Sequence, residues 1–164
     1  MNSMLWRTVL GTFAGYAAIF VWTVLTFTLW WWVLGQEMAF HPGTAEVTGA
    51  WLAGTLPLNL VGAVLGGWVA ARVGGRPASR PAVVSLLLVL VILGVWMAIT
   101  QTTASDEAVV AIDPASDLSP FEAAAVAIQP LWISWVLPAL GGLGVWMGGV
   151  LGHPRPEAGP TERP

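Results

Sequence analysis

The sequence contains no cysteine, which excludes disulfide scaffolds, thiolate metal sites, redox pairs and cysteine nucleophiles. Lysine is also absent, so all six basic residues are arginine. Charged residues make up only 9% of the chain, against about 25% in an ordinary globular protein. That is too little charge to solvate the surface of a soluble domain. Because 56% of the residues are hydrophobic, most of the surface is expected to face lipid.

Four stretches of the chain carry no Asp, Glu, Lys or Arg, and they cover residues 8–36, 47–71, 81–105 and 123–154. Each exceeds the ~20 residues that a helix needs to cross a bilayer. Lipid offers no hydrogen-bond partner to an open backbone, so each stretch is expected to be helical. The sequence therefore predicts an all-α integral membrane domain over residues 1–152. Its four transmembrane helices are expected at about residues 5–34, 48–72, 81–101 and 131–152.

The arginines predict the orientation of these helices. They lie before the first helix, between the second and third, and after the fourth, at Arg7, Arg72, Arg76, Arg80, Arg155 and Arg163. The positive-inside rule makes this side cytoplasmic, so both termini are expected in the cytoplasm. Exclusive use of arginine beside abundant Ala, Gly, Val and Pro suggests a GC-rich bacterial genome. The predicted location is the bacterial cytoplasmic (inner) membrane, crossed several times.

The third connection is the longest, and it is acidic and polar from residue 102 to residue 118, which predicts a solvated loop. At its end, Ser119 can cap a helix, Pro120 suits the first helical position, and Glu122 stands at the capping-box spacing. A short interfacial helix is therefore expected at about residues 120–129, followed by the fourth membrane helix. The tail, residues 153–164, combines four prolines with alternating charges and is expected to be disordered.

Small residues recur at helical spacing along one face of three predicted helices. The candidate packing or solute-lining residues are Gly11, Gly15 and Trp22 in the first helix, Asn59, Gly62 and Gly66 in the second, and Gly144 and Gly148 in the fourth. Small side chains let helix backbones approach closely, which is a main source of helix association in lipid. The spacing leaves open whether the partner helix belongs to the same bundle or to a second copy.

The second and fourth helices also resemble each other. The stretch from Trp51 to Pro57 matches the stretch from Trp132 to Pro138, and Val and Gly residues further along match at the same separation. Both helices are expected to cross in the same direction, so a duplicated hairpin would be related by an axis along the membrane normal. Chance similarity in a chain rich in Leu, Val, Gly and Trp is the alternative. Pro57 and Pro138 each predict a helix kink, and in a duplicated hairpin the two kinks would face one another.

Catalytic chemistry has little support in this sequence. An intramembrane enzyme or a proton-coupled transporter normally needs an ionisable group within the bilayer, and the four apolar runs offer none at depth. His41 and His153 fall on opposite sides of the membrane, so they cannot share a metal ion or haem. The acidic loop lacks the spacing of a calcium site. We therefore expect a non-enzymatic protein without cofactor, metal or nucleic-acid partner.

Asn59 is the most informative polar residue, because Pro57 leaves the carbonyl of Ala53 without its helical partner. Such breaks line substrate sites in transporters and also occur as plain kinks. The favoured hypothesis is an accessory or packing subunit of a membrane complex, or a homo-oligomer. Its partners would be the lipid bilayer and other membrane subunits or further copies of itself. The alternative hypothesis is a channel or facilitator for a small neutral solute that passes near Asn59.

Trp22 and Asn59 are expected at the same depth, about 20 Å from the arginine side at ~1.5 Å per residue. Both lie on small-residue faces of antiparallel helices joined by a short connection. The sequence therefore predicts a direct hydrogen bond from the Trp22 indole N–H to the Asn59 side-chain carbonyl. The alternative is that Trp22 faces lipid and Asn59 bonds back to its own helix.

Cysteine labelling tests the predicted orientation. Single cysteines at Thr44 and Ser116 should react with an impermeant thiol reagent added to intact protoplasts, because both positions lie in outer connections. A cysteine at Ser79 should not react. Labelling at Ser79 alone would invert the orientation, and the unmodified chain, which has no cysteine, is the blank.

Overall fold

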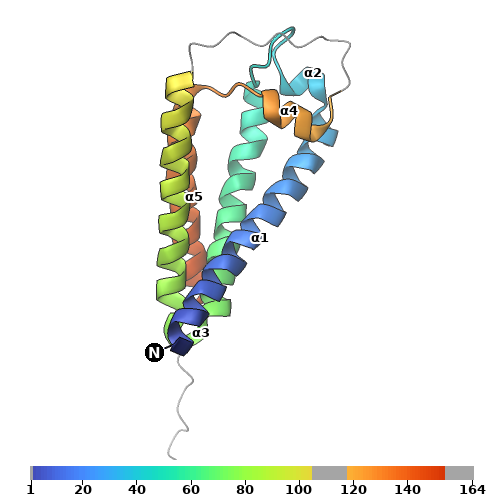
Figure 1. Ribbon diagram of the computed structural model, residues 1–164. Helices are drawn as coiled ribbons and strands as arrows, with labels where there is room; N and C mark the ends of the chain where they lie inside the picture. Colours follow the sequence, from blue (N-terminus) through green and yellow to red (C-terminus); the bar gives the residue numbers. More distant parts are fainter. Residues whose placement is uncertain (1, 105–117, 154–164) are drawn as a thin grey trace, which may run out of the picture.

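The computed structural model of the chain describes residues 2–104 and 118–153. These residues form helices α1 (Asn2–Leu34), α2 (Gln36–Ala39), α3 (Gly49–Ala104), α4 (Pro120–Val126) and α5 (Leu131–Gly152), shown in Figure 1. Extended structure among them is limited to two isolated β-bridges. The predicted all-helical fold is confirmed for the described residues. The acidic stretch of residues 106–117 and the tail from residue 154 onward lie outside them.

The long helix α3 is broken near its middle, where Gly75 and Arg76 leave helical φ and ψ. Gly75 has a φ of 59°, which glycine adopts without steric penalty. The chain turns back here, so α3 consists of a first arm, residues 49–74, and a second arm, residues 77–104 (Figure 1). The sequence predicted a longer arginine-rich connection with the next helix starting at residue 81. That start was too late, because Pro77 suits the first turn of a helix.

Three helical segments are long and apolar enough to cross a membrane: Ser3–Leu34, Gly49–Thr100 and Leu131–Gly152. These lengths and compositions suggest a membrane protein. The second segment contains the break, and each arm of α3 alone exceeds the ~20 residues of a membrane span. The end of α1 and both ends of α5 fall at the predicted residues.

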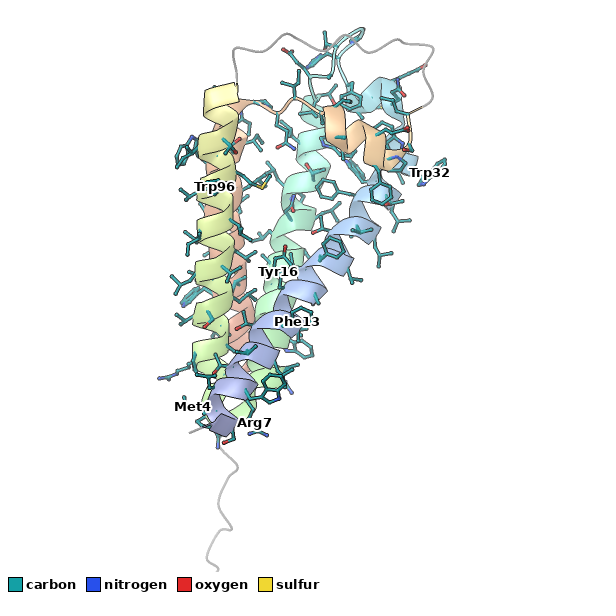
Figure 2. All side chains as sticks on the ribbon, in the orientation of Figure 1. Met4, Arg7, Phe13, Tyr16, Trp32 and Trp96 are labelled. Atoms are coloured by element: carbon teal, nitrogen blue, oxygen red, sulfur yellow. The ribbon has the colours of Figure 1, made fainter. Side chains whose placement is uncertain are left out.

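The two ends of the bundle differ in chemistry. The start of α1, the break in α3 and the end of α5 lie together at one end (Figure 1), here called the arginine end. Arg7 lies there (Figure 2), and Arg72, Arg76 and Arg80 flank the break. The short helices α2 and α4 cover the opposite end, here called the capped end (Figure 1). Among the described residues, arginines therefore gather at a single end.

The helices α1 and α5 both pack against α3, and in the described residues they do not contact each other. The buried core of the bundle consists of Ala63, Ala70, Ala71, Val83, Leu86 and Val145. Half of these side chains are alanine. A core built from such small side chains requires the helix backbones to approach closely.

The capped end is a compact structure with its own apolar core. Ser119 and Glu122 form the predicted capping box of α4: the Ser119 hydroxyl accepts from the Glu122 backbone N–H, and the Glu122 carboxylate accepts from the Ser119 N–H. Hydrogen bonds from the side chain and backbone of Ser119 lower the pKa of the Glu122 carboxyl below its ordinary value. The helix ends at Val126, earlier than predicted. The Val47 N–H donates to the carbonyl of Ile128, and the Ile128 N–H donates to the carbonyl of Ala45, so the connection between α2 and α3 is tied to the segment that follows α4.

The burial of Ser79 affects the labelling experiment. Ser79 is only 6% exposed, so a cysteine there would be shielded in either orientation. Arg76 is exposed and lies within the same turn. Arg76→Cys is therefore the better position for the inner-side cysteine.

Candidate functional site

The candidate glycines of α1 meet the first arm of α3 directly. A Cβ atom built on Gly15 would lie 2.7 Å from the carbonyl oxygen of Gly66, and one built on Gly66 would lie 2.9 Å from that of Gly15. Nearer the arginine end, a Cβ on Gly11 would lie 2.8 Å from the carbonyl oxygen of Ala70. No side chain larger than hydrogen fits at these positions unless the helices move apart.

Trp22 packs over Gly62 in the same interface. A Cβ on Gly62 would lie 2.6 Å from the indole ring, and the indole N–H donates to the backbone carbonyl of Leu58 at 2.9 Å. Asn59 instead donates its side-chain amide to the carbonyl of Thr55 on its own helix, at 2.9 Å. The predicted hydrogen bond between the two side chains is therefore wrong. The bare backbone at Gly62 lets the indole reach a main-chain acceptor.

Trp30 packs on α3 in a similar way, two helical turns nearer the capped end. Its indole lies directly against Gly54. Among the described residues its buried N–H has no hydrogen-bond partner. α1 therefore lies closer to α3 at the glycine contacts near the arginine end than at the tryptophan contacts near the capped end. This agrees with the tilt of α1, which leans away from α5 toward the capped end (Figure 1).

The first arm of α3 makes a second close interface with α5. A Cβ on Gly144 would lie 2.6 Å from the Cβ of Ala63, and one on Gly152 would lie 2.9 Å from the Cβ of Ala71. Between these two contacts, Gly148 packs against the main chain of Val64. The candidate glycines of α5 therefore contact a helix of the same chain.

This interface is locally two-fold symmetric. Gly67 packs against the main chain of Val145, and Gly148 packs against the main chain of Val64. In the sequence resemblance between the two helices, Val64 matches Val145 and Gly67 matches Gly148. This matching turns each of the two contacts into the other. Both helices run from the capped end to the arginine end (Figure 1). A duplicated hairpin requires such symmetry, and so does any parallel helix pair with matched small residues.

The two prolines do not face one another. Pro57 is exposed on the first arm of α3, and the departure from helical φ and ψ lies further along, at Gly75 and Arg76. Pro138 packs against the second arm, where a Cβ on Gly94 would lie 2.6 Å from its ring. The expectation of two facing kinks is not met, because the interface between the two helices uses their glycine faces.

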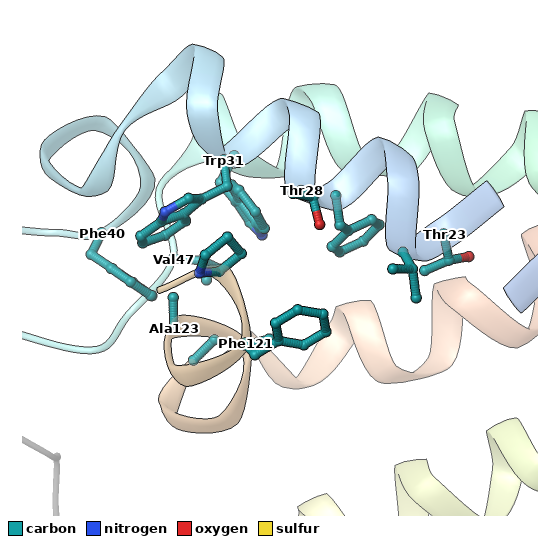
Figure 3. A pocket seen from close by; sticks show the side chains of 13 residues that line it. Thr23, Thr28, Trp31, Phe40, Val47, Phe121 and Ala123 are labelled. Atoms are coloured by element: carbon teal, nitrogen blue, oxygen red, sulfur yellow. The ribbon is translucent and has the colours of Figure 1, made fainter. Parts of the chain in front are cut away.

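An apolar cavity of about 180 Å³ lies between α1 and α4 at the capped end (Figure 3). Its aromatic walls come from Phe27, Trp31, Phe40, Trp51 and Phe121. The Trp31 ring is only 6% exposed and makes edge contacts with Phe40 and Trp51. Trp31 and Trp51 belong to the core of the capped end, because distant segments of the chain fold over them.

A lateral groove of about 400 Å³ runs along the outside of the bundle between α1 and the second arm of α3. Its lining is Thr8, Val9, Thr12, Phe13, Tyr16, Ser85, Val89 and Leu93. Thr8 and Thr12 donate to backbone carbonyls one turn earlier. In the part of the chain that the structure describes, the hydroxyls of Tyr16 and Ser85 have no hydrogen-bond partner. Sequence reasoning missed this groove, because the helix tilt brings its two walls together.

No group of three or more His, Asp, Glu or Cys side chains among the described residues could hold a metal ion. No family model, curated protein or solved structure matches the chain. The function of the chain is therefore inferred from the chemistry of its own surfaces.

Substitution of a single interface glycine tests the packing. Gly148→Ala should lower the free energy of unfolding by about 1–3 kcal/mol, because the new methyl group meets the main chain of Val64. Gly141→Ala in the same helix is the matched control, since a Cβ there meets nothing within 4 Å. Thermal unfolding of both variants in one detergent gives the comparison. Equal stability of the two variants would contradict the close contact.

A double-mutant cycle tests the corrected role of Trp22. Trp22→Phe should destabilise the bundle by about 0.6 kcal/mol through loss of the bond to Leu58. Asn59→Leu should add its own effect, with a coupling energy below about 0.5 kcal/mol, because the two side chains do not bond to each other. Unfolding free energies of the four proteins give the coupling. A coupling energy above about 1 kcal/mol would instead support a direct hydrogen bond between the two side chains.

Proposed function

We propose that this chain is a non-enzymatic subunit of the bacterial cytoplasmic membrane that crosses the bilayer four times, with the arginine end in the cytoplasm. In this proposal, the subunit assembles laterally with a membrane helix of another protein or of a second copy. Four crossings are supported by the break at Gly75, because each arm of α3 is long enough to span the bilayer. The arginines gathered at one end support the orientation.

In this proposal, glycine-mediated packing holds the bundle together. Its glycine faces are occupied within one chain, by Gly15 against Gly66 and by Gly148 against Val64. They are therefore not free to bind a partner. An assembly surface has to lie on the outside of the bundle.

The observation that carries the proposal is the lateral groove with the hydroxyl of Tyr16. Tyr16 lies nine residues beyond Arg7 on α1 (Figure 2), about 14 Å from it along the helix axis, so in the proposed embedding it reaches the hydrocarbon region. The ring is 41% exposed, and a tyrosine hydroxyl cannot reach the carbonyls of its own helix. A polar group without a partner in hydrocarbon is unfavourable. A neighbouring helix with a carbonyl or hydroxyl at this depth would satisfy it.

The shape of the groove favours a helix as the partner. On the α1 wall of the groove, Thr8 and Thr12 are small residues beside the larger Phe13 and Tyr16, and their hydroxyls already bond within the chain. Small residues allow close approach of another helix, and the hydroxyls of Tyr16 and Ser85 can form hydrogen bonds with it.

A facilitator for a small neutral solute has less support. Asn59 uses its amide within its own helix, and it lines neither the apolar cavity at the capped end nor the lateral groove. We therefore do not propose a solute path at this residue.

Crosslinking in native membranes tests the lateral assembly. The variant Phe13→Cys places a thiol in the groove, and Leu65→Cys places one at similar depth on an exposed face of α3. With a photoreactive maleimide attached, the cysteine at position 13 should give one discrete adduct, and the cysteine at position 65 should not. Adding Tyr16→Phe to Phe13→Cys should reduce the adduct severalfold, since the hydroxyl no longer bonds to the partner.

The mass of the adduct separates the two kinds of assembly, since a doubled mass identifies a second copy and any other discrete mass identifies another subunit. Absence of an adduct at position 13, or equal adducts at both positions, would contradict the proposal.

A further inference from the structure

A second groove, of about 480 Å³, lies at the arginine end between the second arm of α3 and the end of α5. Val83 and Val84 form one apolar wall, and Val150 lies on the other. Arg80 and His153 stand where the groove reaches the end of the bundle, and Trp146 lies deeper along α5. The groove is therefore charged at its outer limit and apolar along its length.

Arg80 is available for an external ligand, whereas other arginines have partners within the chain. Arg7 donates to the backbone carbonyl of Arg76 at 3.1 Å, and the guanidinium of Arg72 lies 5.2 Å from the centre of the Trp68 ring. Arg80 is exposed, and among the described residues its guanidinium has no hydrogen bond or ion pair. Its charge is thus not compensated from within the described residues.

His153 shares the rim of the groove with Arg80, and Trp146 lies deeper along α5. The Nδ1 atom of His153 is hydrogen-bonded to the carbonyl of Gly149, which orients the ring and leaves Nε2 on its opposite edge. Trp146 is 59% exposed and lines the groove about 10 Å deeper at ~1.5 Å per residue. An indole at this level suits the boundary between headgroups and acyl chains.

The order of charged and apolar side chains along the groove matches the order of headgroup and acyl chain in a phospholipid. Arg80 and Val84 are one helical turn apart, about 6 Å, so the positive charge gives way to apolar surface over the length of a headgroup. Basic pockets between membrane helices on the cytoplasmic side are suited to anionic headgroups. We propose that this groove binds an anionic phospholipid, with its phosphate at Arg80 and one acyl chain along Val83, Val84 and Val150.

This inference needs the membrane embedding proposed above, with the arginine end at headgroup level, but not the lateral assembly. The lateral groove lies between α1 and the second arm of α3, whereas the lipid groove lies between the second arm and α5. The two sites use different faces, so failure of one leaves the other intact.

Native mass spectrometry of the purified full chain in mild detergent tests the proposal. With phosphatidylglycerol added, we expect a one-to-one complex with the unmodified chain and with Arg72→Gln. Arg80→Gln should weaken retention of phosphatidylglycerol at least about fivefold, because the phosphate loses its cationic partner. Because the Arg80 side chain is exposed, the variant should unfold at nearly the same temperature as the unmodified chain.

Two further comparisons separate a lipid site from diffuse charge attraction. Val150→Trp fills the groove and should also weaken retention, whereas Leu151→Trp, next to it and outside the lining, should not. Phosphatidylcholine and glycerol phosphate without acyl chains should both be retained less than phosphatidylglycerol. Equal losses in the two arginine variants, equal retention of phosphatidylcholine, or equal retention of glycerol phosphate would overturn the proposal.

Discussion

In the proposed glycine-mediated packing, the rest of the structure depends on direct contact between helix backbones on two sides of one helix, the first arm of α3. Gly15 and Gly66 lie where α1 contacts this arm, and Gly144 and Gly148 lie where α5 contacts it. In lipid, apolar side chains gain little by leaving their surroundings, so association comes from close packing and hydrogen bonds between helices. Glycine contributes to both, because it removes the spacer between backbones and exposes carbonyls such as that of Leu58 to the Trp22 indole.

This constraint accounts for the arrangement of the other parts. The first arm of α3 is occupied on both sides, so among the described residues α1 and α5 do not meet. The tight turn at Gly75 then brings the second arm back against α5, where Val83 packs on Gly149. At the capped end, α2 and α4 cover the space that the tilt of α1 opens (Figure 1). The two grooves on which the proposals rest therefore lie on the outside of the bundle, one between α1 and the second arm of α3 and one between that arm and α5.

Local patterns in the sequence predicted the start of α4 and both ends of α5, but not the end of α4 or the start of the second arm of α3. The Ser119 and Glu122 capping box and the position of α5 depend on neighbouring residues, and both were predicted correctly. The small-residue faces also depend on local spacing, although which helix they would meet did not follow from it. The turn at Gly75 was harder, because nearby arginines favoured a longer connection and the positive φ of Gly75 is visible only in the structure.

Tertiary packing decided the features that the sequence did not predict. The acceptor of the Trp22 N–H depends on how closely the indole approaches the backbone at Gly62. Trp31 is buried because the segments that follow α1 and precede α5 fold over it at the capped end, and these segments are far apart in the sequence. The grooves at Tyr16 and Arg80 likewise exist only once the helices are placed side by side.

The contact between α3 and α5 can be measured directly with two cysteines. Ala71 and Gly152 face each other near the arginine end, where a Cβ on Gly152 would lie 2.9 Å from that of Ala71. A disulfide needs a Cβ separation of about 3.8 Å, which a small shift at the end of α5 provides. In native membranes, the double variant Ala71→Cys with Gly152→Cys should form an intramolecular disulfide on mild oxidation, whereas Val73→Cys with Gly152→Cys should not. Disulfides only between chains, or none, would contradict a bundle built around the first arm of α3.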